Sequence, residues 1–182
     1  MLSSKAMETK NSPKTRIYYY EINEEGELLF EGKPLLDEKT ISFFFKHLKP
    51  VVHLENKMEN TLPSTSEKAP PQYIVLCQGE KNFITCFDAP LVTTSIRIEK
   101  DPKNILLSVT LLFRGSVKDD LDPKTLFIGD NNILYFKAMN GQIPGRFSRK
   151  CYMEITQFIF EKEGGYFIEI NQKTYPISSK AP

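Results

Sequence analysis

The feature that most constrains the fold is a series of short runs rich in aromatic and β-branched residues, each followed by turn residues. Residues 16–22 read Arg-Ile-Tyr-Tyr-Tyr-Glu-Ile and lead into Asn-Glu-Glu-Gly at residues 23–26, which is typical of a strand entering a turn. Similar runs occupy residues 27–30, 73–77, 82–87, 91–98, 105–113, 132–137, 166–170 and 174–177. Because the connections between neighbouring runs are short, the sequence predicts antiparallel pairing and a β-rich fold.

Two segments have the spacing of amphipathic helices. The first begins at Asp37, a good N-cap, and ends before Pro50. Its apolar stripe consists of Ile41, Phe44, Phe45 and Leu48. The second is expected over residues 147–160 behind Ser148, with an apolar stripe formed by Cys151, Ile155, Phe158 and Ile159. Strands with two helices predict the α+β class, and residues 139–146, with two glycines and a proline, are expected to form a loop.

The same order of elements occurs twice along the chain. A short aromatic strand, at residues 28–30 and again at 133–136, precedes a loop, a helix and a hairpin led by Tyr73 or Tyr166. Two similar strand-helix-hairpin modules packed together are therefore expected, although chance similarity of ordinary ββαββ elements is the alternative. The predicted organisation is a disordered tail at 1–15, a first module at 16–100 with a mobile loop at 50–71, a second module at 101–178 and a tail at 179–182.

Charge and composition limit the partners. The chain has 24 Lys and Arg against 23 Asp and Glu, so net charge gives no reason to expect nucleic acid or an anionic membrane. RNA contact would need a contiguous basic face that the linear sequence does not show. No apolar run reaches the roughly 18 to 20 residues of a membrane span. The aromatic triplets at 18–20 and 43–45 are interpreted as core, since their residues fit strand alternation and a helix stripe.

The three cysteines form no CxxC pair, which favours a reducing compartment. We therefore expect a cytoplasmic protein. The first 15 residues carry three lysines and one acid, so a mitochondrial targeting segment is the alternative.

Residues 76–92, Leu-Cys-Gln-Gly-Glu-Lys-Asn-Phe-Ile-Thr-Cys-Phe-Asp-Ala-Pro-Leu-Val, together with residues 16–20, resemble an uncharacterised family that includes the mammalian chromosome-eight open-reading-frame eighty-two product. A more distant resemblance is to a bacterial family of unknown function. It rests on Tyr73, Leu76, Glu80, Lys81, Ile84, Asp88, Ala89 and Pro90, and departs from that family at Phe87 and Leu91. This second resemblance implies tandem α+β motifs of pleckstrin-homology-like character and a role in ligand binding or signalling rather than catalysis.

Residues for catalysis or metal binding are few. His47 and His53 are the only histidines, and Cys77, Cys86 and Cys151 lack zinc-site spacing. Neither resembled family supplies an established catalytic residue. We therefore expect no catalytic residue, no metal and no cofactor.

The candidate ligand-binding residues are Glu80, Asn82, Asp88, Arg146 and Arg149. The first three are expected at one end of the second hairpin, where Asp88 or Asn82 would satisfy backbone N–H groups beside Pro90. The functional interpretation places them in a cleft between the modules, opposite an anion site made of Arg114, Arg146 and Arg149. The sequence thus predicts a non-catalytic module that binds a small anionic ligand or a protein. The alternative is a small enzyme with an acidic and arginine-lined cleft.

Overall fold

The computed structural model describes residues 15–51 and 70–179 of the chain. Almost all of the predicted tails at 1–15 and 179–182, and most of the predicted loop at 50–71, therefore lie outside the described residues. The described part is an α+β protein rich in strands, as the sequence predicts.

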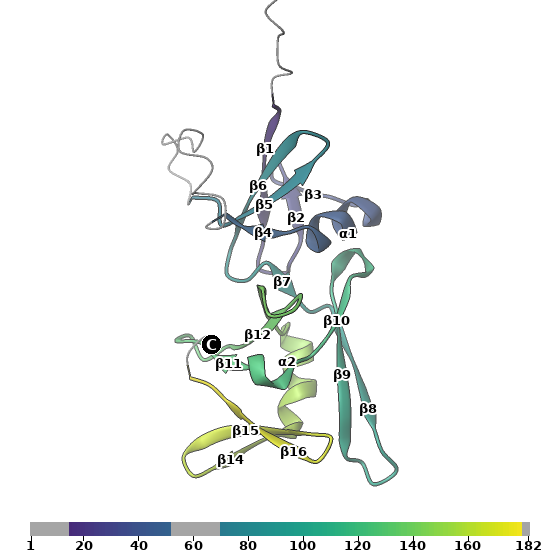
Figure 1. Ribbon diagram of the computed structural model, residues 1–182, viewed down its shortest axis with the longest axis vertical. Helices are drawn as coiled ribbons and strands as arrows, with labels where there is room; N and C mark the ends of the chain where they lie inside the picture. The colour runs from purple at the N-terminus through teal and green to yellow at the C-terminus, as the bar shows by residue number, and fades with distance from the viewer. Residues whose placement is uncertain (1–14, 52–69, 180–182) are drawn as a thin grey trace, which may run out of the picture.

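The first half of the chain forms a six-stranded sheet crossed by helix α1, Glu38–Lys46 (Figure 1). Its strands are β1 (Ile17–Ile22), β2 (Leu28–Phe30), β3 (Lys33–Pro34), β4 (Lys49–Pro50), β5 (Tyr73–Cys77) and β6 (Glu80–Cys86). Their order in space is β3-β2-β1-β6-β5-β4, and β1 pairs with β6 in parallel over six residues. The hairpin predicted near Tyr73 is confirmed as β5 and β6.

Helix α1 forms where the sequence predicts it. The backbone N–H of Thr40 donates to Asp37 Oδ2 at 2.9 Å, which satisfies one of the free amides of the first turn. Ile41, Phe44 and Phe45 are buried. The ring of Phe44 lies edge-on to Tyr20 of β1, with 4.8 Å between ring centroids. The predicted core role is therefore confirmed for Phe44 and Phe45 and for Tyr20, which packs against Phe44, but it is wrong for Tyr19, whose side chain is exposed.

The second half repeats this topology. Its elements are β11 (Phe127–Ile128), β12 (Leu134–Ala138), β13 (Ile143–Arg146), α2 (Arg149–Ile155), β14 (Ile159–Lys162), β15 (Gly165–Ile170) and β16 (Lys173–Ile177). Strands β13, β12 and β11 are neighbours, as are β16, β15 and β14. A parallel bridge between Phe127 and Ser178 joins the two sets, so the order matches β3-β2-β1-β6-β5-β4. We call the two halves the first and second repeat.

The segment between the repeats ties them together. Strand β7 (Leu91–Val92) adds in parallel to β13 of the second repeat. Strands β8 (Ser95–Lys100), β9 (Leu106–Leu112) and β10 (Lys118–Asp120) form an antiparallel sheet along one side of the molecule (Figure 1). This sheet contacts α2 through β8 and β15 through β9, and one buried apolar cluster includes residues of both repeats. The predicted module division at residue 100 stays a prediction.

The antiparallel pairing predicted for neighbouring strands is confirmed, but two pairs of distant strands and one predicted loop differ from the sequence prediction. Strands β1 and β6 pair in parallel, and so do β7 and β13. A short connection forces two strands to pair antiparallel, but these partners lie far apart in the chain, so either direction is open to them. Residues 143–146 are a strand rather than a loop. Gly145 reflects close packing there, since a Cβ atom on it would lie 2.4 Å from the ring of Phe136.

The second helix is shorter than predicted, and one predicted strand is divided. Helix α2 ends at Ile155, a 3-10 turn covers Thr156–Phe158, and β14 begins at Ile159, which pairs with Ile168. The short apolar run at residues 158–160 fits the spacing of a helix and that of a strand equally well. The periodicity of apolar residues therefore does not distinguish a longer α2 from a separate strand. Residues 91–98, predicted as one strand, belong to β7 and β8 with a break at Thr93 and Thr94.

Candidate functional site

A partly buried ion pair lies where the two repeats meet. Asp88 follows β6 of the first repeat, and Arg146 ends β13 of the second. Arg146 Nε lies 3.3 Å from Asp88 Oδ2, and the two side chains are 11% and 22% exposed. Tyr135 of β12 donates its hydroxyl to the same carboxylate, with distances of 2.8 and 3.0 Å to the two oxygens. Asp88 therefore links the two repeats.

Strand β7 brings these groups together. It pairs Val92 with Arg146, and the backbone N–H of Thr93 donates to the carbonyl of Arg146 at 3.1 Å. Arg146 Nη2 also donates to the backbone carbonyl of Glu24, in the turn between β1 and β2. The guanidinium of Arg146 is thus fixed from both repeats. Its Nε is buried and, despite the nearby carboxylate, makes no hydrogen bond of good geometry within the described residues.

Beside Arg146 is an open groove of about 510 Å³ between the repeats. Its lining combines guanidinium and hydroxyl groups, from Arg114, Arg146, Arg149, Thr93, Thr94 and Ser148. Glu24 and Glu25 line it as well. We call this hollow the arginine groove. All three arginines that the sequence suggested for an anion site therefore share one surface.

The other two arginines differ in how they are held. Arg114 Nη2 lies 3.0 Å from Glu27 Oε1, and Asn23 donates to the second carboxylate oxygen of Glu27 at 2.9 Å. The Nε of Arg114 is buried and has no hydrogen-bond partner in the described ranges. Arg149, the first residue of α2, is exposed at the groove.

Two hydroxyl groups that line the groove accept hydrogen bonds from backbone N–H groups. Thr93 Oγ1 accepts from the N–H of Ser148 at 3.0 Å, and Ser148 Oγ accepts from the N–H of Cys151 at 3.5 Å. A hydroxyl that accepts still carries its own proton, so the partly exposed Ser148 can donate to an oxyanion, whereas Thr93 is buried. The groove therefore presents donors from two kinds of side chain.

Glu80 and Asn82 do not belong to this site. Glu80 opens β6 and lies 2.8 Å from Arg16, whereas Asn82 is buried and donates to the carbonyl of Val75 at 3.1 Å. Asp88 follows the other end of β6, roughly 25 Å along an extended chain from Glu80. The predicted cluster of the three at one end of the hairpin is therefore wrong, because an extended strand separates them.

Asp88 does not bind the backbone amides beside Pro90, which is the structural role that the sequence suggests for it. Its carboxylate binds the side chains of Tyr135 and Arg146 rather than the backbone amides beside Pro90. Sequence reasoning missed Tyr135, Thr93 and the carbonyl of Glu24. Tyr135 lies in an aromatic strand that suggests core packing, and a backbone carbonyl carries no signal in the sequence.

Titration properties around Asp88 argue against reactive groups there. Burial raises the pKa of Cys86 to about 11, with the Asp88 charge as a second cause. Burial is also the largest cause that raises the pKa of the Tyr135 phenol, although the hydrogen bond from Asn131 at 2.7 Å acts in the opposite direction. Both groups therefore stay protonated at neutral pH.

Two further properties concern the described residues as a set. No three His, Cys, Asp or Glu side chains within residues 15–51 and 70–179 are placed to hold a metal ion. No helix in those ranges has both the length and the apolar character that a membrane crossing requires.

Solved structures with a similar fold come from two bacteria. A DUF1285 family protein from Silicibacter pomeroyi DSS-3 superposes with a TM-score of 0.61 and 12% sequence identity, covering 91% of this chain and 84% of that one. A DUF1285 family protein from Shewanella baltica OS155 gives a TM-score of 0.50 and 18% identity, covering 76% of this chain and 90% of that one. At these identities the likeness establishes the fold alone.

A family model covers most of the sequence. It matches residues 8–172, and its description is "Domain of unknown function (DUF4505)". This range includes both repeats except for the last strand, β16, and the residues after it. The matched segment contains Asp88, Arg146 and Arg149. The chain therefore belongs to the DUF4505 family of domains of unknown function.

Proposed function

We propose that this protein is a non-catalytic binding module that holds a small anionic ligand in the arginine groove. The observation that carries the proposal is the arrangement of Arg114, Arg146 and Arg149 around one hollow. Arg114 and Arg146 are fixed by ion pairs, and each has a buried Nε without a hydrogen-bond partner in the described structure. Guanidinium groups held in place lose little freedom when they bind a carboxylate or phosphate.

The charges around the groove limit the size of the ligand. Glu27 and Asp88 each pair with one arginine, and the side chains of Glu24 and Glu25 are exposed beside it. A polyanion would meet these carboxylates. A ligand with a single phosphate or carboxylate group, directed at Arg149 and the floor of the groove, fits this balance better.

The groove supports binding better than catalysis. Asp88 binds Tyr135 behind Arg146 and lines a separate shallow hollow, so it supplies no base to the groove. Thr93 and Ser148 orient the chain at the start of α2 through their hydroxyls. The alternative, a small enzyme with an acidic and arginine-lined cleft, would need an acid or base that faces the ligand.

Thermal melts with and without added anions test the proposal. Phosphate or citrate at about 20 mM, against chloride at matched ionic strength, should raise the melting temperature by about 3 to 6 °C for a millimolar dissociation constant. Arg149→Gln should lose most of this increase. Arg97→Gln removes the same charge from an exposed position on β8 outside the groove and should keep the increase.

Either of two results would contradict the proposal. The wild-type protein could melt at the same temperature in every anion, or Arg149→Gln and Arg97→Gln could respond alike. Native mass spectrometry of freshly purified protein then identifies any ligand retained in the groove. Conversion of that ligand into a product during incubation would establish the enzyme alternative.

The compartment is part of the same proposal. Cys77, Cys86 and Cys151 are all free thiols, as expected in a reducing environment. We propose the cytoplasm, with the mitochondrion as the alternative. Imaging of the full-length chain with a C-terminal fluorescent tag distinguishes the two.

A further inference from the structure

The two repeats differ in how their sheets close. In the first repeat, β1 and β6 pair over six residues, from Ile17 with Lys81 to Ile22 with Cys86. In the second repeat, β11 and the end of β16 share only the bridge between Phe127 and Ser178. Beyond this bridge the two half-sheets separate, and α2 lies beside the opening (Figure 1). The second repeat is therefore open where the first is continuous.

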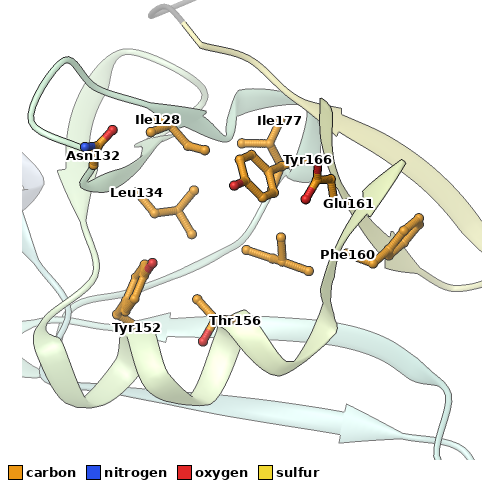
Figure 2. Close-up of a pocket in the computed structure, with 10 residues that line it drawn as sticks. Ile128, Asn132, Leu134, Tyr152, Thr156, Phe160, Glu161, Tyr166 and Ile177 are labelled. Carbon is orange, nitrogen blue, oxygen red and sulfur yellow. The ribbon is translucent and has the colours of Figure 1, made fainter. Parts of the chain in front are cut away.

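A pocket of about 540 Å³ occupies this opening (Figure 2). Ile128 and Leu134 line it from one half-sheet, and Ile159 and Ile177 line it from the other. Tyr152 of α2 forms a further wall. A pocket of this volume, mostly apolar and built from several elements, has the usual properties of a small-molecule site.

The first repeat has aromatic rings packed between its helix and sheet. Tyr20 lies 5.1 Å from Phe30 and 4.8 Å from Phe44, measured between ring centroids. The first contact joins β2 to β1 within the sheet, and the second packs α1 onto β1. The pocket of the second repeat is thus a departure from an otherwise shared topology, rather than a general feature of the fold.

The pocket carries polar groups at several places, since Asn132 and Thr156 lie apart from Glu161 and Tyr166 in Figure 2. Glu161 and Tyr166 are cross-strand partners on β14 and β15, and their side chains lie side by side in Figure 2, with Leu134 opposite. Among the lining residues, all of which belong to the described part of the chain, Glu161 alone carries a charge. The neighbouring Lys162 pairs with a different carboxylate, since its Nζ lies 3.7 Å from Glu163 Oε1. The pocket therefore combines apolar walls with one carboxylate.

We propose that this pocket binds a small molecule with an apolar or aromatic body and an amine group. The body packs between the aliphatic side chains of the two half-sheets, and the ammonium group pairs with Glu161. The ring of Tyr166, beside Glu161, favours the same ligand, since aromatic faces attract cations. A carboxylate on the ligand would meet Glu161 without a compensating base in the lining. This site is separate from the arginine groove, and the inference does not rest on the proposed function.

Three probes with one body and different heads test the proposal on the full chain. They are 4-phenylbutylamine, 4-phenylbutanol and 4-phenylbutyrate, each titrated by calorimetry, with methyl NMR of Leu134, Ile159 and Ile177 to locate binding. The amine should bind at least tenfold more tightly than the carboxylate, with the alcohol between them. The methyl signals of the three residues should shift with the amine.

A matched pair of variants isolates the carboxylate. Glu161→Gln should reduce amine affinity about tenfold, to the level of the alcohol, and leave alcohol affinity unchanged. Glu169→Gln removes the same charge from an exposed position on β15 that does not line the pocket, and should preserve the selectivity. The proposal is overturned by equal affinity for the three heads, by absence of binding at 10 mM amine, or by methyl shifts confined to other residues.

Discussion

A Cβ atom placed on Gly115 would lie 2.4 Å from the backbone nitrogen of Ser42 in helix α1. Gly115 sits in the 3-10 turn Arg114–Ser116 with a φ of +68°, a conformation that glycine adopts without strain. The turn and the helix therefore meet backbone to backbone. This contact holds Arg114 beside the first repeat, where it pairs with Glu27.

Gly115→Ala should accordingly destabilise the fold by more than about 3 kcal/mol, because positive-φ strain of roughly 1 to 2 kcal/mol adds to a clash with rigid backbone. Gly32→Ala is the matched control. Gly32 has a φ of +75° and open space around its Cβ position, so only the strain applies. Urea unfolding of both variants measures the difference, and equal losses would show that α1 moves aside at no cost.

Two phenylalanines on the predicted helical stripes should respond differently to truncation. Phe44 is 5% exposed, so Phe44→Ala should cost about 3 to 5 kcal/mol. Phe158 lies outside α2 and is only partly buried, beneath the ammonium of Lys100 at 4.8 Å. Phe158→Ala should cost about 1 to 2 kcal/mol. Chemical denaturation compares them, and a larger loss at Phe158 would contradict this order.

The contacts of Asp88 predict a graded response to substitution. Asp88→Asn keeps an oxygen for the hydroxyl of Tyr135 but loses the charge beside Arg146, at a cost of about 1 to 2 kcal/mol. Asp88→Ala leaves the buried guanidinium without its partner and should cost about 3 kcal/mol or more. A double-mutant cycle with Arg146→Met measures their coupling. Additive losses would show that the 3.3 Å separation carries no interaction energy.

Cys86 should be slow to alkylate at neutral pH. Its pKa of about 11 leaves little thiolate, so labelling by iodoacetamide should rise about tenfold per pH unit between pH 8 and 10. The raised pKa also stabilises the fold below about pH 9, and this contribution falls between pH 9 and 11 as the thiol ionises in the unfolded chain alone. Peptide mapping by mass spectrometry follows the labelling. Unfolding of Cys86→Ala over this range is the control, and a rate independent of pH would refute the assignment.

Much of the fold follows from local patterns. The hairpins near Tyr73 and Tyr166 and the cap of α1 at Asp37 need only turn chemistry and the period of apolar residues. The repeated order of elements was also visible in the sequence. The parallel pairing of β1 with β6 was not, because nothing local to either strand specifies a partner so far along the chain.

The candidate site was predictable only in part. Arg146 and Arg149 stand out as basic residues near the start of a helix, and the structure places them together in the arginine groove. Glu80 and Asp88 are close in sequence, which suggests a shared site. The extended strand β6 lies between them, however, and holds the two side chains far apart. The pocket of the second repeat has no sequence signature, since it arises from strands that fail to pair.

The parallel pairing of β1 with β6 has a consequence for synthesis on the ribosome. Thr85 of β6 donates to the carbonyl of Tyr20 in β1, 65 positions earlier in the chain, at 3.4 Å. When β1 and β2 leave the exit tunnel, β6 has not yet been synthesised. The edge of β1 that pairs with β6 therefore stays unpaired while the nascent chain lengthens. Contacts of such long range close slowly because the loop entropy is lost before the strands bind. Until β6 has been made, this edge of β1 can therefore pair with strands of other chains.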